Sequence, residues 1–93
     1  MFRVQITPQA RAALEKRMAA CASTRPGLLV HRAAPPDSRS AFACQLACFE
    51  TYPENELLDV DGVRVYLVLV PRANEKGVRI ECRKGSLRAE RIP

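Results

Sequence analysis

Four cysteines are the residues with the widest chemistry in this 93-residue chain, because thiolates bind metals, hold iron–sulfur clusters and exchange disulfides. They are Cys21, Cys44, Cys48 and Cys82. The closest pair, Cys44 and Cys48, has the spacing C-x3-C. On a helix this spacing places both sulfurs on one face, whereas on a strand four residues span about 13 Å, too far for one zinc ion.

The segment that carries this pair, residues 41–49, alternates in a way that favours a strand with Phe42, Cys44, Leu46 and Cys48 on its core face. Its alanines leave a helix as a second interpretation. With a strand, the thiols are expected to act as small apolar packing groups. A metal or iron–sulfur site built from Cys44, Cys48 and Cys82 remains the alternative, and otherwise no cofactor is expected.

The single histidine, His31, does not complete a recognisable catalytic group. A nucleophile–base pair with Cys44 or Cys48 would need a third side chain to orient the imidazole, and none is evident. The four glycines stand alone, so there is no glycine-rich phosphate loop. We therefore expect a protein that is not an enzyme.

The net charge of +5 is concentrated in the last third of the chain. Residues 1–63 carry seven basic and seven acidic side chains, whereas residues 64–93 carry eight basic and three acidic ones. This asymmetry could attract nucleic acid or an acidic protein, although a solvated polar sheet face would look the same. Only one of the five aromatic residues, Tyr66, lies in the basic third, so stacking platforms for single-stranded nucleic acid are scarce. The candidate partner-binding residues are Arg64, Arg79, Arg83, Lys84 and Arg88.

The elements that must position these residues begin with a short strand over residues 2–6, followed by a helix. Thr7 is a good N-cap and Pro8 suits the first helical position, so the helix is expected to run from Pro8 to about Ala22. Its core-facing stripe is predicted to contain Leu14, Met18 and Cys21.

A hairpin at Asp61-Gly62 is the strongest local signal, because both central residues of a type I′ turn need positive φ. The turn would set Val60 opposite Val63 and Asp59 opposite Arg64. Other strands are expected over residues 28–32, 63–70, 78–83 and 87–92, with a proline-containing loop over residues 33–40. One helix and mostly antiparallel strands predict a single α+β domain over residues 1–93.

No apolar run is long enough to cross a membrane, and the N-terminus lacks the apolar stretch of a signal peptide. We therefore expect a cytoplasmic protein that does not associate with membranes. Its oligomeric state cannot be deduced from these patterns.

The order of segments resembles the HesB/IscA-like family, the A-type iron–sulfur carriers. The similar pieces are Ile6-Thr7-Pro8 with Ala10 and Leu14, Gly27-Leu28-Leu29-Val30, Pro53-Glu54-Asn55-Glu56-Leu57-Leu58 before Asp61-Gly62-Val63-Arg64-Val65, and Gly77 with Ile80-Glu81. Together they span nearly the whole chain, although each motif is short. The resemblance implies a small mixed-sheet fold with one N-terminal helix.

The family's cluster ligands are missing from the matching positions. The family has a cysteine in a Cys-Ser-Gly loop where this chain has Ala33-Ala34-Pro35-Pro36-Asp37-Ser38, and a Cys-Gly-Cys near a C-terminus that here ends at Ile92-Pro93. The resemblance therefore implies a protein-binding accessory role, linked to iron–sulfur or sulfur metabolism, without cluster carriage. Its alternatives are a small basic nucleic-acid-binding module and an atypical carrier that uses the three candidate cysteines.

Overall fold

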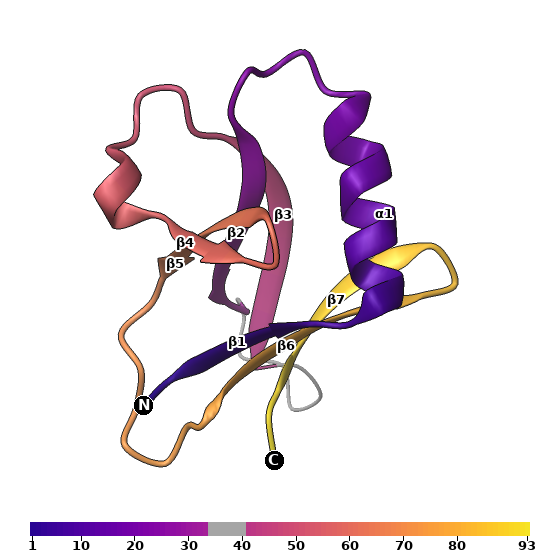
Figure 1. Ribbon diagram of the computed structural model, residues 1–93. Coiled ribbons are helices and arrows are strands. Elements are labelled where there is room, and N and C mark those ends of the chain that lie inside the picture. The colour runs from indigo at the N-terminus through magenta and orange to yellow at the C-terminus, as the bar shows by residue number, and fades with distance from the viewer. Residues whose placement is uncertain (34–40) are drawn as a thin grey trace.

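The computed structural model of the protein (Figure 1) describes residues 1–33 and 41–93. These residues form an α+β fold, as predicted. The predicted loop over residues 33–40 lies, apart from residue 33, outside the described residues. The elements are β1 (Arg3–Ile6), α1 (Pro8–Ala19), β2 (Pro26–Arg32), β3 (Phe42–Cys48), the 3-10 helix η1 (Glu54–Glu56), β4 (Leu58–Val60), β5 (Val63–Val68), β6 (Gly77–Arg83) and β7 (Ser86–Arg91).

The helix α1 begins where the sequence predicts. Thr7 has extended backbone angles (φ −67°, ψ 155°) and its hydroxyl oxygen accepts a hydrogen bond from the Ala10 amide at 3.2 Å. The helix ends at Ala19 rather than near Ala22. Just beyond this end, the Glu50 carboxylate accepts hydrogen bonds from the Ser23 hydroxyl and from the amides of Thr24 and Arg25, which holds the chain in a turn towards β2.

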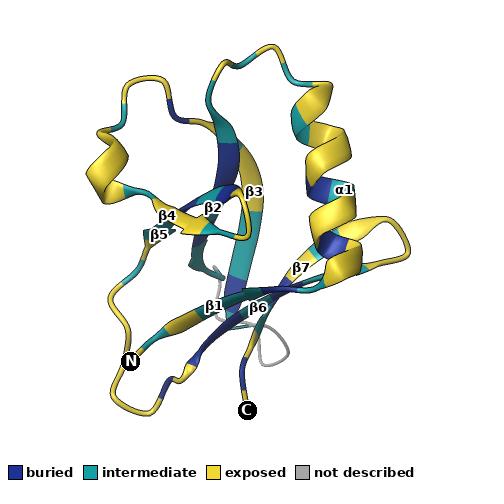
Figure 2. Ribbon diagram, in the orientation of Figure 1, coloured by how far each residue is buried: buried dark blue, intermediate teal, exposed yellow. Residues whose placement is uncertain are grey.

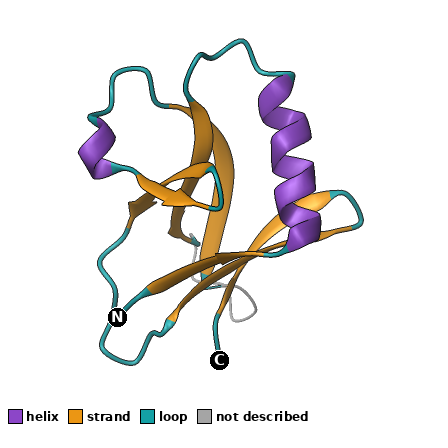
Figure 3. Ribbon diagram, in the orientation of Figure 1, coloured by secondary structure: helices purple, strands orange, loops and turns teal. Residues whose placement is uncertain are grey.

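The strands form two mixed sheets, one ordered β1-β6-β7 and the other β3-β2-β5-β4. Three pairings are antiparallel: β2 with β3, β4 with β5 and β6 with β7. The other two, β1 with β6 and β2 with β5, are parallel. Figure 3 shows α1 beside the strands, with β1, β6 and β7 running past its N-terminal end.

The Asp61-Gly62 hairpin has the predicted register. Val60 pairs with Val63 and Asp59 with Arg64, and both turn residues have positive φ, 51° at Asp61 and 85° at Gly62. The Asp59 carboxylate nevertheless forms no ion pair with the Arg64 guanidinium that lies opposite it. It accepts a hydrogen bond from the Gly62 amide at 2.9 Å, and the Arg64 guanidinium lies 3.7 Å from Glu54. Asp59 therefore stabilises the turn rather than the cross-strand pair.

The core lies between the two sheets and the inner face of α1 (Figure 2). The helix contributes Ala10 and Leu14, whereas Met18 is only partly buried. The strand over residues 41–49 is confirmed, but the side chains on its predicted core face become more exposed towards its C-terminal end. Phe42 is buried, Cys44 is half-buried, and Leu46 (38% exposed) and Cys48 are exposed. No helix in the described part of the chain is long and apolar enough to cross a membrane.

A buried carboxylate fixes the connection between β5 and β6, which the sequence suggests is only a polar loop. Glu75 is 7% exposed, and both its oxygens accept hydrogen bonds from the Arg32 guanidinium, at 2.7 and 2.8 Å. The amide of Arg72 adds a third bond at 2.8 Å. The Arg32 guanidinium also bonds the Val70 carbonyl and lies 5.6 Å from the centre of the Phe42 ring. The chain that leads into β6 is therefore tied to β2.

Candidate functional site

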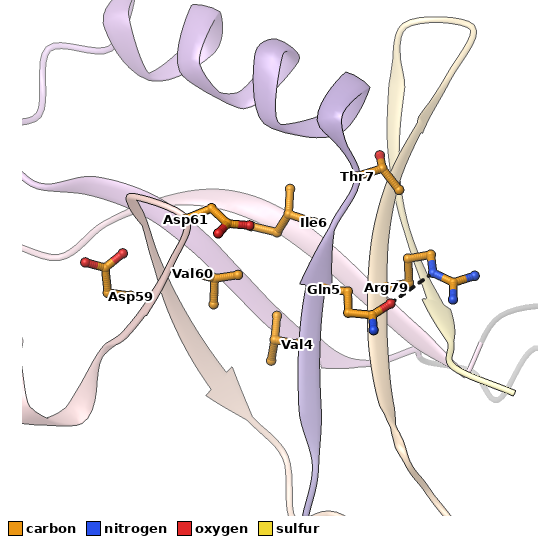
Figure 4. Close-up of a pocket in the computed structure, with 8 residues that line it drawn as sticks. All are labelled: Val4, Gln5, Ile6, Thr7, Asp59, Val60, Asp61 and Arg79. Carbon is orange, nitrogen blue, oxygen red and sulfur yellow. Dashed lines mark hydrogen bonds between the residues drawn. The ribbon is translucent and has the colours of Figure 1, made fainter.

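An open hollow of about 510 Å³ lies between β1, an edge strand of one sheet, and β4, an edge strand of the other (Figure 4). One wall is β1 with Thr7, and the other is the β4–β5 hairpin. Although β1 and β4 contact each other, they belong to different sheets and form no ladder. We call this place the seam, and its lining residues are Val4, Gln5, Ile6, Thr7, Asp59, Val60, Asp61 and Arg79.

Among the described residues, no strand pairs with β1 on the side that faces away from β6. The amides of Arg3 and Thr7 donate to the Lys76 and Ile80 carbonyls, each at 3.0 Å, on the β6 side. In a strand, successive residues direct their N–H and C=O groups to opposite edges. Val4 and Ile6, the intervening residues, therefore direct these groups away from β6, as expected of an edge strand.

The hairpin turns a second edge towards the same region, and no strand in residues 1–33 or 41–93 pairs with it. In a two-residue hairpin the pair next to the turn, here Val60 and Val63, exchanges backbone hydrogen bonds. The next pair, Asp59 and Arg64, is then a non-hydrogen-bonded pair, so the amide and carbonyl of Asp59 point away from β5. Edge groups of this kind can be satisfied by water or by an added strand.

Charge at the seam is acidic on the hairpin side. Asp59 and Asp61 are exposed, and within the described residues neither carboxylate forms an ion pair. Figure 4 shows Asp61 directed towards Ile6, while Arg79 lies on the other side of β1. The Arg79 guanidinium donates to the Gln5 side chain at 3.3 Å and lies 4.0 Å from Glu81. The carboxylates of the hairpin therefore remain available to a cationic ligand.

Three of the five predicted partner-binding residues share the outer face of the three-stranded sheet. The register sets Arg79 opposite Glu90, Glu81 opposite Arg88 and Arg83 opposite Ser86. Lys84 follows in the β6–β7 turn, with φ 50°. Acidic neighbours reduce the charge of this face, since the Arg83 guanidinium lies 3.0 Å from Glu81 and 3.6 Å from Glu90.

The fifth predicted residue, Arg64, lies apart from this face, on β5 of the other sheet. It shares Glu54 with Arg25, whose guanidinium is 2.9 Å from the same carboxylate oxygen. The structure therefore does not gather all five residues into one basic patch.

An aromatic cluster on the four-stranded sheet was not predicted. Phe49 and Tyr52 have ring centres 5.0 Å apart, and Tyr52 and Tyr66 are 5.1 Å apart, all in edge-to-face geometry. Phe49 is fully buried and packs over Gly27, where a Cβ atom would lie 2.5 Å from the Phe49 ring. The long stretch between β3 and β4 is thus anchored on the sheet.

The candidate metal ligands are not gathered into a centre. Cys44 and Cys48 lie on one strand, Cys82 lies on β6, and only Cys48 is exposed. Burial raises the pKa of the Cys44 thiol, and the positive charge of Arg17 opposes this effect only in part. In the part of the chain that the structure describes, no three His, Cys, Asp or Glu side chains are arranged to hold a metal ion.

The lone histidine makes a local contact rather than a catalytic one. Its Nδ1 atom lies 2.8 Å from the Arg32 carbonyl oxygen. No hydrogen bond between His31 and a cysteine is seen in the described residues.

The seam itself has only weak signals in the sequence. The short alternating segment at residues 2–6 and the Asp-Gly turn predict its two walls, but no local pattern shows that they face each other. Comparisons of the chain with protein-family models, with curated proteins and with solved structures find no match.

Proposed function

We propose that this protein is a non-catalytic binding module whose partner is another protein, and that the seam is where the partner binds. The observation that supports this proposal most is the convergence of two unpaired sheet edges, β1 and the β4 side of the hairpin, on one open hollow. Exposed edges invite pairing with other chains, and proteins commonly cover or charge them. Here the hollow is left open, so the edges suit a binding role.

The HesB/IscA-like resemblance gives this proposal its biological setting. We place the protein beside iron–sulfur or sulfur metabolism, as an accessory component without a cluster of its own. The four cysteines are all unbridged thiols, a state that a reducing compartment maintains. The cytoplasm is therefore the proposed location.

Photo-cross-linking in living cells tests the proposal at two positions. A benzophenone amino acid at Asp61 lies at the seam, whereas the same group at Lys84 lies in the β6–β7 turn. We expect position 61 to give one discrete protein adduct that survives nuclease, and position 84 to give none. A nuclease-sensitive adduct from position 84, with nothing from position 61, would favour the basic nucleic-acid-binding function instead.

Anaerobic reconstitution with iron and sulfide tests the carrier alternative. We expect a colourless protein without bound iron. A coloured protein with stoichiometric iron, which loses that iron in a Cys44→Ser, Cys48→Ser variant, would replace the binding module with an atypical carrier.

A further inference from the structure

We propose that the seam binds its partner by strand addition: an extended peptide pairs with the free edge of β1 and sets a lysine or arginine against the carboxylates of Asp59 and Asp61. This inference rests on the binding function proposed above and adds the chemistry of the partner. It combines two independent features of the seam, its unpaired backbone groups and its unpaired charge.

The backbone of β1 supplies the pairing groups. Val4 and Ile6 each turn an amide and a carbonyl away from β6. Ile6 is only 9% exposed and β4 contacts β1, so an added strand pairs chiefly with the amide and carbonyl of Val4. The four residues of β1 are already held in extended geometry by the ladder to β6. An incoming peptide therefore meets an ordered template, and only the peptide itself must lose conformational freedom.

Side chains of the added strand would alternate between two environments. Those on the inner side would meet Val4, Ile6 and Val60, which line the hollow. Those on the outer side would lie beside Gln5. The inner positions therefore favour apolar residues. Because Val4 and Ile6 of β1 face inwards, every second side chain of the partner must face inwards with them.

The charge of the hairpin selects a cationic partner. Asp61 points towards Ile6 from across the seam, and the second oxygen of Asp59 is not used by the Gly62 amide. A lysine or arginine near the end of the added strand could pair with either carboxylate.

Titration of ¹⁵N-labelled protein with synthetic peptides tests the inference. The probe is the capped hexapeptide (Lys-Val)₃, and its matched control is capped (Glu-Val)₃. We expect the lysine peptide to shift the amide signals of Val4, Ile6 and Asp59 and to bind about three- to tenfold more tightly than the glutamate peptide at low salt. An Asp59→Asn, Asp61→Asn variant should remove this difference, since asparagine keeps the oxygen that accepts from Gly62 and tolerates positive φ.

Proline at position 4 tests the backbone pairing separately. The Val4 amide is outside the β1–β6 ladder, so Val4→Pro removes one seam donor without breaking a ladder bond. Val4→Ala is the matched variant, because it loses the same packing but keeps the amide. We expect Val4→Pro to weaken the lysine peptide at least about fivefold relative to Val4→Ala.

The outcomes separate this inference from the broader function. Failure of both peptides to bind at about 1 mM, or equal binding by the two position-4 variants, would overturn strand addition. A seam cross-link from position 61 would then still support a protein-binding module that uses another mode. Concentration-dependent dimerisation that Val4→Pro abolishes would show that a second copy fills the seam, and would overturn the cationic partner.

Discussion

Glu75 is a buried carboxylate in a segment whose polar sequence predicts an exposed loop. It lies in a segment of polar residues between β5 and β6, yet it is buried and accepts three hydrogen bonds from Arg32 and Arg72. A buried acceptor that loses its partners costs more than the bond itself contributes. We therefore expect Glu75→Gln to lower the free energy of unfolding by about 1–3 kcal/mol in urea denaturation.

Glu54→Gln is the matched control for that substitution. The Glu54 carboxylate also lies 2.9 Å from an arginine, Arg25, but its side chain is 67% exposed. Exposed ion pairs contribute little, so this variant should change stability by less than about 1 kcal/mol. If both variants had equal effects, burial of the Arg32–Glu75 pair would not be what makes it stabilising.

The same carboxylate makes stability depend on pH. Hydrogen bonds from the Arg32 side chain lower the pKa of Glu75 from about 4.5 to about 2, against the opposing effect of burial. A folded-state pKa below the unfolded value gives stability that is complete above pH 4.5 and is lost as pH falls towards 2. Glu50 acts in the same direction, because bonding to the Ser23 hydroxyl also lowers its pKa.

Thermal unfolding between pH 7 and pH 2 checks this dependence. The wild-type protein should lose stability steadily below pH 4.5, and Glu75→Gln should lose less over that range because the group that titrates is gone. Parallel curves for the two proteins would contradict the assignment.

Thiol reactivity should differ along β3. Burial raises the pKa of Cys44, so little thiolate forms there near neutral pH, whereas Cys48 is exposed at the end of the strand. We expect iodoacetamide at pH 7.5 to modify Cys48 well before Cys44, as read by peptide mass spectrometry. Faster modification of Cys44 would show that this strand is more open than its burial indicates.

At the scale of elements, local signals were predictable and distant pairings were not. The Asp-Gly turn sets the β4–β5 register by itself, because type I′ geometry involves only neighbouring residues. The parallel pairing of β1 with β6 joins Arg3 to Gly77, and nothing near either residue encodes its partner. The seam depends on that distant pairing, so the sequence predicts its walls but not the hollow between them.

The same reasoning explains why the predicted core face of β3 is only partly buried. The alternation of Phe42, Cys44, Leu46 and Cys48 correctly predicts which side chains share a face. How far that face is covered depends on where α1 ends and how the second sheet crosses, and both are tertiary features. Leu46 is therefore exposed although its position in the pattern is correct.

Hydrogen exchange should reveal the free edge of β1 directly. The Thr7 amide donates to Ile80, and the ladder places the Gln5 amide on the same side, whereas the amides of Val4 and Ile6 point into the seam. We expect Gln5 and Thr7 to exchange at least about tenfold more slowly than Val4, which is less buried than Ile6. Equal protection of all four amides would mean that the edge is already covered in the free protein.

Close packing between β2 and the aromatic cluster leaves no room for a side chain at Gly27. A Cβ atom at Gly27 would lie 2.5 Å from the Phe49 ring and 2.6 Å from the Arg64 carbonyl oxygen. Gly27→Ala should therefore force β2 and the aromatic cluster apart and cost about 1–3 kcal/mol in urea denaturation. A neutral result would show that Phe49 can leave the sheet at little cost.

At the scale of the whole molecule, the net charge overstates the number of positive charges that are free to contact a phosphate. The chain carries +5, but the outer face of the three-stranded sheet places Glu81 and Glu90 among Arg79, Arg83 and Arg88. Each phosphate contact contributes about −0.9 to the slope of log affinity against log salt on duplex DNA. Arginines already paired with carboxylates should contribute less, so we expect weak binding to a fluorescent 20-base-pair duplex, with a slope shallower than about −3.

A Glu81→Gln, Glu90→Gln variant sharpens this test, because it removes the acidic partners without adding a cation. If the glutamates restrain the basic face, the variant should bind the duplex more tightly and with a steeper slope than the wild-type protein. Steep salt dependence in the wild-type protein, unchanged in the variant, would mean that cations elsewhere on the molecule hold nucleic acid. The basic third of the chain would then be a binding surface in its own right, and the seam would have to share its role with a second partner.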